Sequence, residues 1–234
     1  MKKDALHFIV YLVFIMIGVF NTNTISAADR EMSAEELEKW FNSDEDIVDP
    51  IKLINEGELV FLKKKPELEP HQARHTITIL PGSLKDGWVT LNQCHANLDV
   101  MPAAQVVFQG KRVRNLKILS STNIGKTWIE DKTIQLKNVQ KNATVCLEVE
   151  TKALWKNTDG SYTLKTGPYQ RKFLDGYFPM RLLLEVNYPE NRLTFKQSTP
   201  KIQAGFSVTH DNGIIKVNAL FEGLLYTQLL FNKQ

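Results

Sequence analysis

Apolar and polar residues alternate in short segments along most of this chain, and turn-forming residues separate the segments. From Met180 to Val186 every second residue is apolar, which is the period of a β-strand that buries one face. Asp159-Gly160 and Asp211-Asn212-Gly213 each lie between two such segments and predict hairpins. Parallel sheets need long crossover connections, usually helices, and no helical pattern of that length follows His75. The sequence therefore predicts an all-β fold, an antiparallel β-sandwich of about a dozen short strands with a short N-terminal amphipathic helix.

The first 28 residues have the composition of a secretory signal peptide. Lys2 and Lys3 precede an apolar segment from Phe8 to Phe20, and the small residues Ser26-Ala27-Ala28 follow. The apolar segment is shorter than the roughly 20 residues that a bilayer-spanning helix needs. We expect cleavage after Ala28 and a mature protein that is periplasmic or secreted and has no transmembrane span. An uncleaved membrane anchor is the alternative.

The segment 29–70 is acidic where it begins and basic where it ends. Asp29 to Asp49 holds nine acidic residues, and Ser33 with Glu36 forms a capping box that predicts the amphipathic helix. One strand and a linker rich in lysine and proline follow, without the interleaved aromatic residues of a nucleic-acid-binding surface. We therefore predict no nucleic-acid partner, and we place the β-sandwich domain at 71–234, with 71–166 and 167–234 as candidate sub-sheets.

The chain has two cysteines, Cys94 and Cys146, and both follow the predicted signal peptide. An even pair in an exported protein predicts a disulfide. Each cysteine lies on the phase of its strand that is opposite to the main apolar one. The pattern therefore predicts a disulfide that holds an outer layer to the sheet, and the absence of a Cys-x-x-Cys motif argues against thiol chemistry.

Aromatic and charged residues gather between Gly167 and Pro189, which is the densest collection of turn-forming, aromatic and apolar residues in the mature chain. Gly167-Pro168 predicts a short helical turn there. We expect the bend that follows to form a contact surface, with the binding residues Tyr169, Arg171, Asp175, Tyr177 and Arg181. The first functional hypothesis is therefore an exported binding or accessory protein that contacts an unknown periplasmic protein or a glycan, without catalysis or a cofactor.

Histidines suggest an alternative function. His71, His75 and His95 could hold copper or zinc if the fold brings them together. The i, i+4 spacing of His71 and His75 suits one metal on a helix, but Pro70 and the β-forming residues after His75 predict a loop that enters a strand. Isolated or hydrogen-bonded histidines are the competing interpretation.

A carbohydrate-active hydrolase is the second alternative. Asp175, or Glu148 together with Glu150, could supply the carboxylates of such an enzyme. Glu148 and Glu150 occupy the outer phase of one predicted strand, where a solvated strand face is the favoured explanation because nothing near them is expected to be buried. The chain contains no Gly-x-Ser-x-Gly elbow, no Gly-rich phosphate loop and no His-Glu-x-x-His motif.

Overall fold

The computed structural model describes residues 55–108, 110–173 and 176–234. All of them belong to the second of the two units into which the chain divides, Val48–Gln234. The predicted signal peptide, the predicted acidic helix and Asp175 lie outside the described residues. Within the described ranges, no helix combines the length and the apolar composition that a bilayer crossing requires.

The described residues are almost entirely strands, which confirms the predicted all-β fold. The short helical elements are α2 (Ser83–Asp86) and η2 (Gly110–Arg112), and the strands are β1 (Val60–Phe61), β2 (His71–Thr78), β3 (Trp88–Leu98), β4 (Met101–Val107), β5 (Val113–Glu130), β6 (Thr133–Lys152), β7 (Leu154–Lys156), β8 (Tyr162–Tyr169), β9 (Lys172–Phe173), β10 (Gly176–Tyr177), β11 (Met180–Asn187), β12 (Leu193–Thr199), β13 (Phe206–Asp211), β14 (Ile214–Glu222) and β15 (Leu225–Lys233).

Nine strands form the larger sheet, in the order β1-β14-β11-β2-β3-β6-β4, with β13 paired to β14 and β5 paired to β6. Its pairs are antiparallel except for β11 and β2, which run parallel over their full length. A second sheet has the order β12-β15-β8-β7, and β9 pairs with β10. Both large sheets take strands from each side of residue 166, so they do not correspond to two consecutive stretches of the chain.

The main core lies between the nine-stranded and the four-stranded sheets. β11 contributes Leu182 and Leu184 from the larger sheet, and β8 and β15 contribute Leu164 and Phe231 from the smaller one, all almost fully buried. These are the positions that two-residue alternation predicts to face inward. The same rule places Arg181 and Glu185 on the opposite, outer face of the larger sheet.

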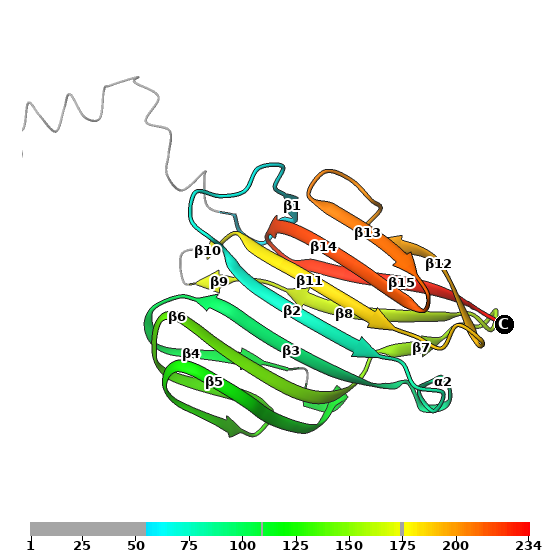
Figure 1. The fold of residues 1–234 in the computed structure, drawn as a ribbon, viewed down its shortest axis with the longest axis horizontal. Helices are drawn as coiled ribbons and strands as arrows, with labels where there is room; N and C mark the ends of the chain where they lie inside the picture. Colours follow the sequence, from blue (N-terminus) through cyan, green and yellow to red (C-terminus); the bar gives the residue numbers. More distant parts are fainter. Residues whose placement is uncertain (1–54, 109, 174–175) are drawn as a thin grey trace, which may run out of the picture. The chain divides into compact units, whose positions relative to one another are not determined.

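β3, β4, β5 and β6 extend the larger sheet into a long ribbon that curls at one end (Figure 1). Asn123 and Asn142 have positive φ angles, and the pairing of β5 with β6 shifts register between Thr122 and Ile124. Asparagine tolerates this backbone conformation better than most residues, so the sequence allows the strands to bend there. A second buried cluster fills the ribbon and consists of Ile134, Leu136, Val139, Ala143, Val145 and Leu147.

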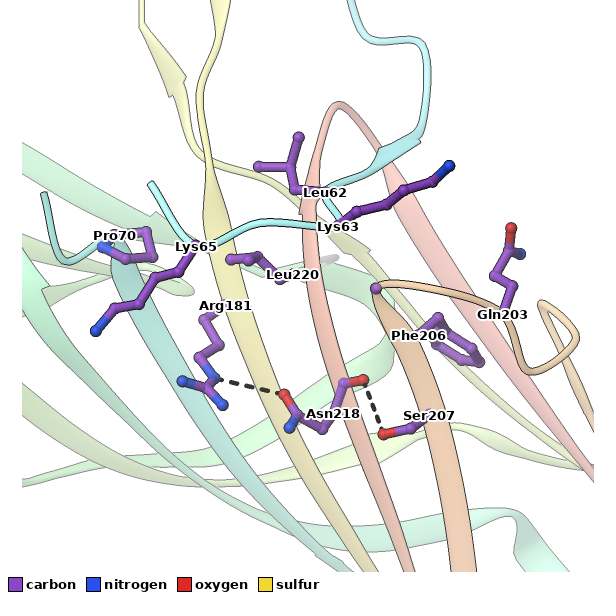
Figure 2. Close-up of a pocket in the computed structure, with 11 residues that line it drawn as sticks. Leu62, Lys63, Lys65, Pro70, Arg181, Gln203, Phe206, Ser207, Asn218 and Leu220 are labelled. Carbon is purple, nitrogen blue, oxygen red and sulfur yellow. Dashed lines mark hydrogen bonds between the residues drawn. The ribbon is translucent and has the colours of Figure 1, made fainter. Parts of the chain in front are cut away.

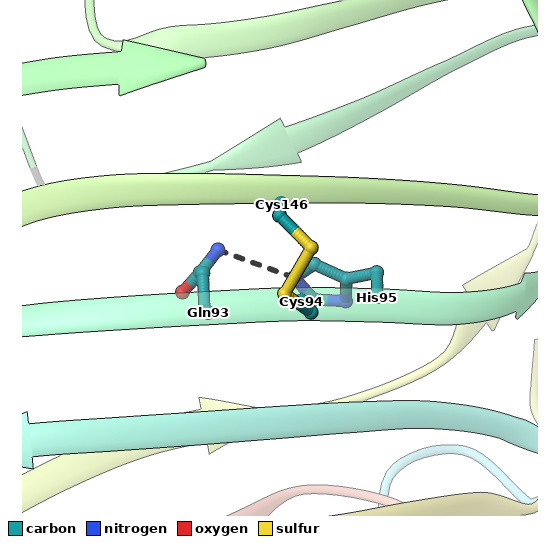
Figure 3. The surroundings of a disulfide bond; sticks show 4 residues. All are labelled: Gln93, Cys94, His95 and Cys146. Carbon is teal, nitrogen blue, oxygen red and sulfur yellow. Dashed lines mark hydrogen bonds between the residues drawn. A yellow bond between two sulfur atoms is a disulfide. The ribbon is translucent and has the colours of Figure 1, made fainter. Parts of the chain in front are cut away.

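A disulfide joins Cys94 of β3 to Cys146 of β6, with an S–S distance of 2.11 Å (Figure 3). The two residues are directly paired across neighbouring strands of one sheet. The predicted bond is therefore confirmed, but it does not hold an outer layer to the sheet. The reason is that alternation in the sequence shows which face a cysteine occupies and does not show which strand lies beside it.

Candidate functional site

The strand β2 begins at His71, so the predicted loop at this histidine is wrong. Main-chain pairing with β11 and β3 on its two edges holds the segment extended from its first residues. On a strand, residues separated by two or four positions share a face. His71 and His75 therefore both face the core, with the small, fully buried Ala73 between them.

His95 comes to the same place from β3. Its main chain is paired with Ala73, so its side chain lies between those of the two β2 histidines. The ring centroid of His95 is 5.1 Å from that of His71 and 5.8 Å from that of His75. Three imidazoles from two neighbouring strands thus form one group, which we call the histidine cluster (His71, His75 and His95).

A chain of hydrogen bonds crosses this cluster. The amide nitrogen of Gln93 lies 3.1 Å from Nε2 of His95, and Nδ1 of His95 lies 3.0 Å from Nε2 of His71 (Figure 3 shows the first contact). With the Gln93 amide as donor, Nε2 of His95 accepts and its Nδ1 carries the proton that is donated to His71. Gln93 is itself buried, and nothing in the sequence marks it as a residue of this site.

His75 is buried without hydrogen bonds of this kind. Neither of its ring nitrogens has a hydrogen-bond partner within the described part of the chain, although the side chain is only 5% exposed. The ring of Tyr169 from β8 lies edge-on to it, with centroids 5.1 Å apart. A buried polar group without a partner costs stability, and in natural proteins it often marks a functional site or the place of an ion or water.

Burial keeps the cluster neutral. It lowers the pKa of His71 to about 4, and the nearby Arg171 adds to this effect. Burial also lowers the pKa of His75 to about 3 and that of His95 well below its usual range, with the neighbouring histidines contributing in each case. Tyr169 has a raised pKa because it is buried as well. At neutral pH the imidazoles therefore carry lone pairs rather than positive charge.

Arg171 and Asp99 form an ion pair beside the cluster. Nε and Nη2 of Arg171 bind the two carboxylate oxygens of Asp99 at 3.0 and 2.5 Å, and Nη1 donates to the carbonyl of Pro179 at 3.2 Å. The guanidinium also lies over the rings of Phe173 and Phe178, at 5.4 and 5.5 Å from their centroids. The hydrogen bonds of Arg171 thus go to groups of the protein itself. The carboxylate of Asp99 balances its positive charge beside the histidines.

The predicted contact residues that the structure describes do not share one surface. Tyr169 and Arg171 belong to the surroundings of the histidine cluster, while Arg181 lies on the outer face of β11. Tyr177 stands in β10, where Lys172 lies 5.3 Å from its ring centroid. Gly167-Pro168 is part of β8 instead of a helical turn, because the end of β8 pairs with β15.

A groove of about 430 Å³ opens on the outer face of the larger sheet (Figure 2). Its lining comes from the segment between β1 and β2, from β11 and β14, and from β13 with the residues just before it. It consists of Leu62, Lys63, Lys65, Pro70, Arg181, Gln203, Gly205, Phe206, Ser207, Asn218 and Leu220. Three of these residues are cationic and none is acidic. The sequence predicts only a linker at Lys63 and Lys65, because nothing in it shows that they lie beside Arg181.

Glu148 and Glu150 lie on the outer face of β6 and pair with cations of β5. Lys117 binds Glu148 at 3.1 Å, and Arg114 binds Glu150 at 2.6 Å. Hydrogen bonds from Arg114 and Asn115 lower the pKa of Glu150. Both carboxylates are thus paired with cations on a solvated strand face, which is the arrangement expected of surface ion pairs.

No family model matches the chain, and neither does any curated protein. Among solved structures, it is similar to the M1 zinc metallopeptidase from Deinococcus radiodurans, with 10% identity over 76% of this chain and 43% of that one and a TM-score of 0.38. A two-domain M1 zinc metallopeptidase variant bound to L-arginine gives 11% identity over 75% and 43% of the chains, with a TM-score of 0.39. The chain spans less than half the length of these enzymes, and similarity at this level carries no inference about function.

Proposed function

We propose that this protein is an exported metal-binding protein and that the histidine cluster holds a copper or zinc ion. The observation that carries the proposal is the meeting of three core-facing imidazoles, His71 half-buried and His75 and His95 buried, of which His75 has no hydrogen-bond partner for either ring nitrogen within the described residues. Neutral imidazole is a preferred ligand of both metals. The disulfide supports export, because such bonds persist in oxidising compartments.

The separations of His95 from the other two histidines are close to those between imidazoles on one ion. Two imidazole nitrogens on a tetrahedral zinc lie about 3.4 Å apart and the ring centroids lie roughly 5 to 6 Å apart, given metal–nitrogen bonds of about 2.0 Å. The His71 and His95 nitrogens are 3.0 Å apart, and the centroid separations that involve His95 are 5.1 and 5.8 Å.

The side chains must nevertheless rearrange to bind an ion. In the described part of the chain, no three or more His, Cys, Asp or Glu side chains stand where they could hold a metal. Binding therefore requires that the proton on Nδ1 of His95 moves to its Nε2, with the Gln93 amide turned so that its oxygen accepts the new N–H. The nitrogens of His71 and His95 must also separate by a few tenths of an ångström, and His75 must turn toward them. The unpartnered state of His75 favours this, because turning its ring breaks no hydrogen bond.

Titration of the purified protein with Zn²⁺ and with Cu²⁺, followed by calorimetry and elemental analysis, tests the proposal. We expect one ion per chain, and a His75→Ala variant that binds at least about tenfold more weakly, as is usual when the ligand environment of a metal is disturbed. His210→Ala is the matched control, because His210 is exposed at the end of β13. Absence of stoichiometric binding, or an equal loss in the control variant, would refute the proposal.

A further inference from the structure

The groove on the outer face presents cationic side chains whose hydrogen-bonding capacity is largely unused. Arg181 is half-buried, and in the described chain its guanidinium makes one hydrogen bond, from Nε to Oδ1 of Asn218 at 3.4 Å (Figure 2). A guanidinium has five donors, so most of those of Arg181 are available to a ligand. Lys63 forms no ion pair with any described residue, and Lys65 pairs with Glu69 outside the groove lining.

The neighbouring polar groups complete a surface that suits a carboxylate. Ser207, Asn218 and Gln203 line the same groove, and Ser207 donates to the carbonyl of Asn218 at 3.5 Å. The planar guanidinium fork binds carboxylates in a bidentate manner, and lysines add a point charge that tolerates different positions of the anion. No described lining residue is acidic, so nothing within the lining competes for Arg181 and Lys63, whereas Lys65 is paired with Glu69.

The size and the lining of the groove narrow the class of ligand. About 430 Å³ is within the range of sites that hold a drug-sized ligand and is larger than a single small anion needs. Its one aromatic residue, Phe206, is only 1% exposed and offers no ring face on which a sugar could stack. A peptide with acidic side chains meets both conditions, since it is larger than a single small anion and needs no aromatic platform.

We propose that this groove binds an acidic peptide segment of a partner protein, with Arg181 pairing with one of its carboxylates. The inference does not depend on the proposed metal site, because the groove and the histidine cluster lie on opposite faces of the larger sheet. Attraction between charges at such a surface raises the association rate and makes the affinity sensitive to salt.

Fluorescence anisotropy with a labelled peptide of alternating glutamate and glycine residues tests this inference on the full mature chain. We expect saturable binding at low salt, at least tenfold weaker binding by Arg181→Gln, and less than a twofold change in Arg114→Gln, which removes an equal charge from the same sheet at β5. Circular dichroism of both variants confirms that they are folded.

Three results would overturn the inference. The first is no binding of the acidic peptide by the wild-type chain at low salt. The second is an equal loss in Arg181→Gln and Arg114→Gln, which would show that only the overall charge matters. The third is tighter binding of an oligosaccharide of uronic acids than of the peptide, which would assign the groove to a glycan instead.

Discussion

Replacing His75 with leucine should stabilise the metal-free protein. In the wild type both ring nitrogens of His75 are buried without a hydrogen-bond partner within the described residues. An unsatisfied buried polar group costs about 1–3 kcal/mol, and leucine is apolar and similar in volume. We therefore expect the free energy of unfolding to rise by about 1–3 kcal/mol at pH 8.

The stability advantage of His75→Leu over the wild type should increase as the pH falls. The pKa of His75 is about 3 in the folded protein and 6.5 in its unperturbed state, so the unfolded chain binds more protons between these values. The wild type therefore has the full contribution of neutral His75 above pH 6.5 and loses it as the pH falls toward 3. Between pH 8 and pH 4.5 this amounts to roughly 3 kcal/mol, from about 1.4 kcal/mol for each pH unit below 6.5. His71, His95, Arg171, Asp99 and Tyr169 face the site in both proteins, so the difference between them isolates His75 to first order.

Urea unfolding followed by tryptophan fluorescence, with a chelator present, measures both effects. His210→Leu is the control, because it removes a histidine that is exposed on β13. The reasoning fails if His75→Leu is less stable than the wild type at pH 8. It also fails if the stability difference between the two proteins stays the same at pH 8 and pH 4.5.

Two further predictions concern the fold. Replacing both Cys94 and Cys146 with alanine should leave the sheet intact and lower the free energy of unfolding by about 4 kcal/mol. The reason is that the bond closes a loop with a sequence separation of 52 residues. A loss below about 1 kcal/mol in denaturant unfolding would contradict this chain-entropy argument. Gly223→Ala should destabilise the protein by more than about 2 kcal/mol, because φ is +86° and the new Cβ would meet the carbonyl oxygen of Glu58. Gly160→Ala is the control, because φ is +84° there and nothing lies within 4 Å of the added Cβ. This variant should lose only the roughly 1–2 kcal/mol that a left-handed backbone conformation costs a residue with a side chain. Equal melting temperatures for the two variants would show that the contact with Glu58 is unimportant.

The fold could be predicted from the sequence because alternation is a local property. The strand from Met180 to Asn187 and the hairpin at Asp211-Asn212-Gly213 are present, and Cys94 and Cys146 lie on the predicted phase. The same information does not determine which strands are neighbours. The sequence therefore could not show that the disulfide joins two strands of one sheet, or that β2 and β11 run parallel.

The candidate sites could be predicted only in part, for the same reason. His71, His75 and His95 were identified as a set, yet the spacing of His71 and His75 was judged against a helix, whereas on a strand it also places both side chains on one face. Gln93 and the Asp99–Arg171 pair were missed because they reach the cluster through strand pairing and a long-range contact. Lys63 and Lys65 were interpreted as part of a linker, since their proximity to Arg181 depends on tertiary structure.

The length of β6 has a consequence for how the protein loses its structure. This one uninterrupted strand places Val149 in the core between the sheets and Val145 and Leu147 in the core of the curled ribbon. Neither core can lose the strand without exposing side chains of the other to water. The two cores should therefore behave as a single cooperative unit, and amides along β6 should exchange their hydrogens only when the whole unit opens.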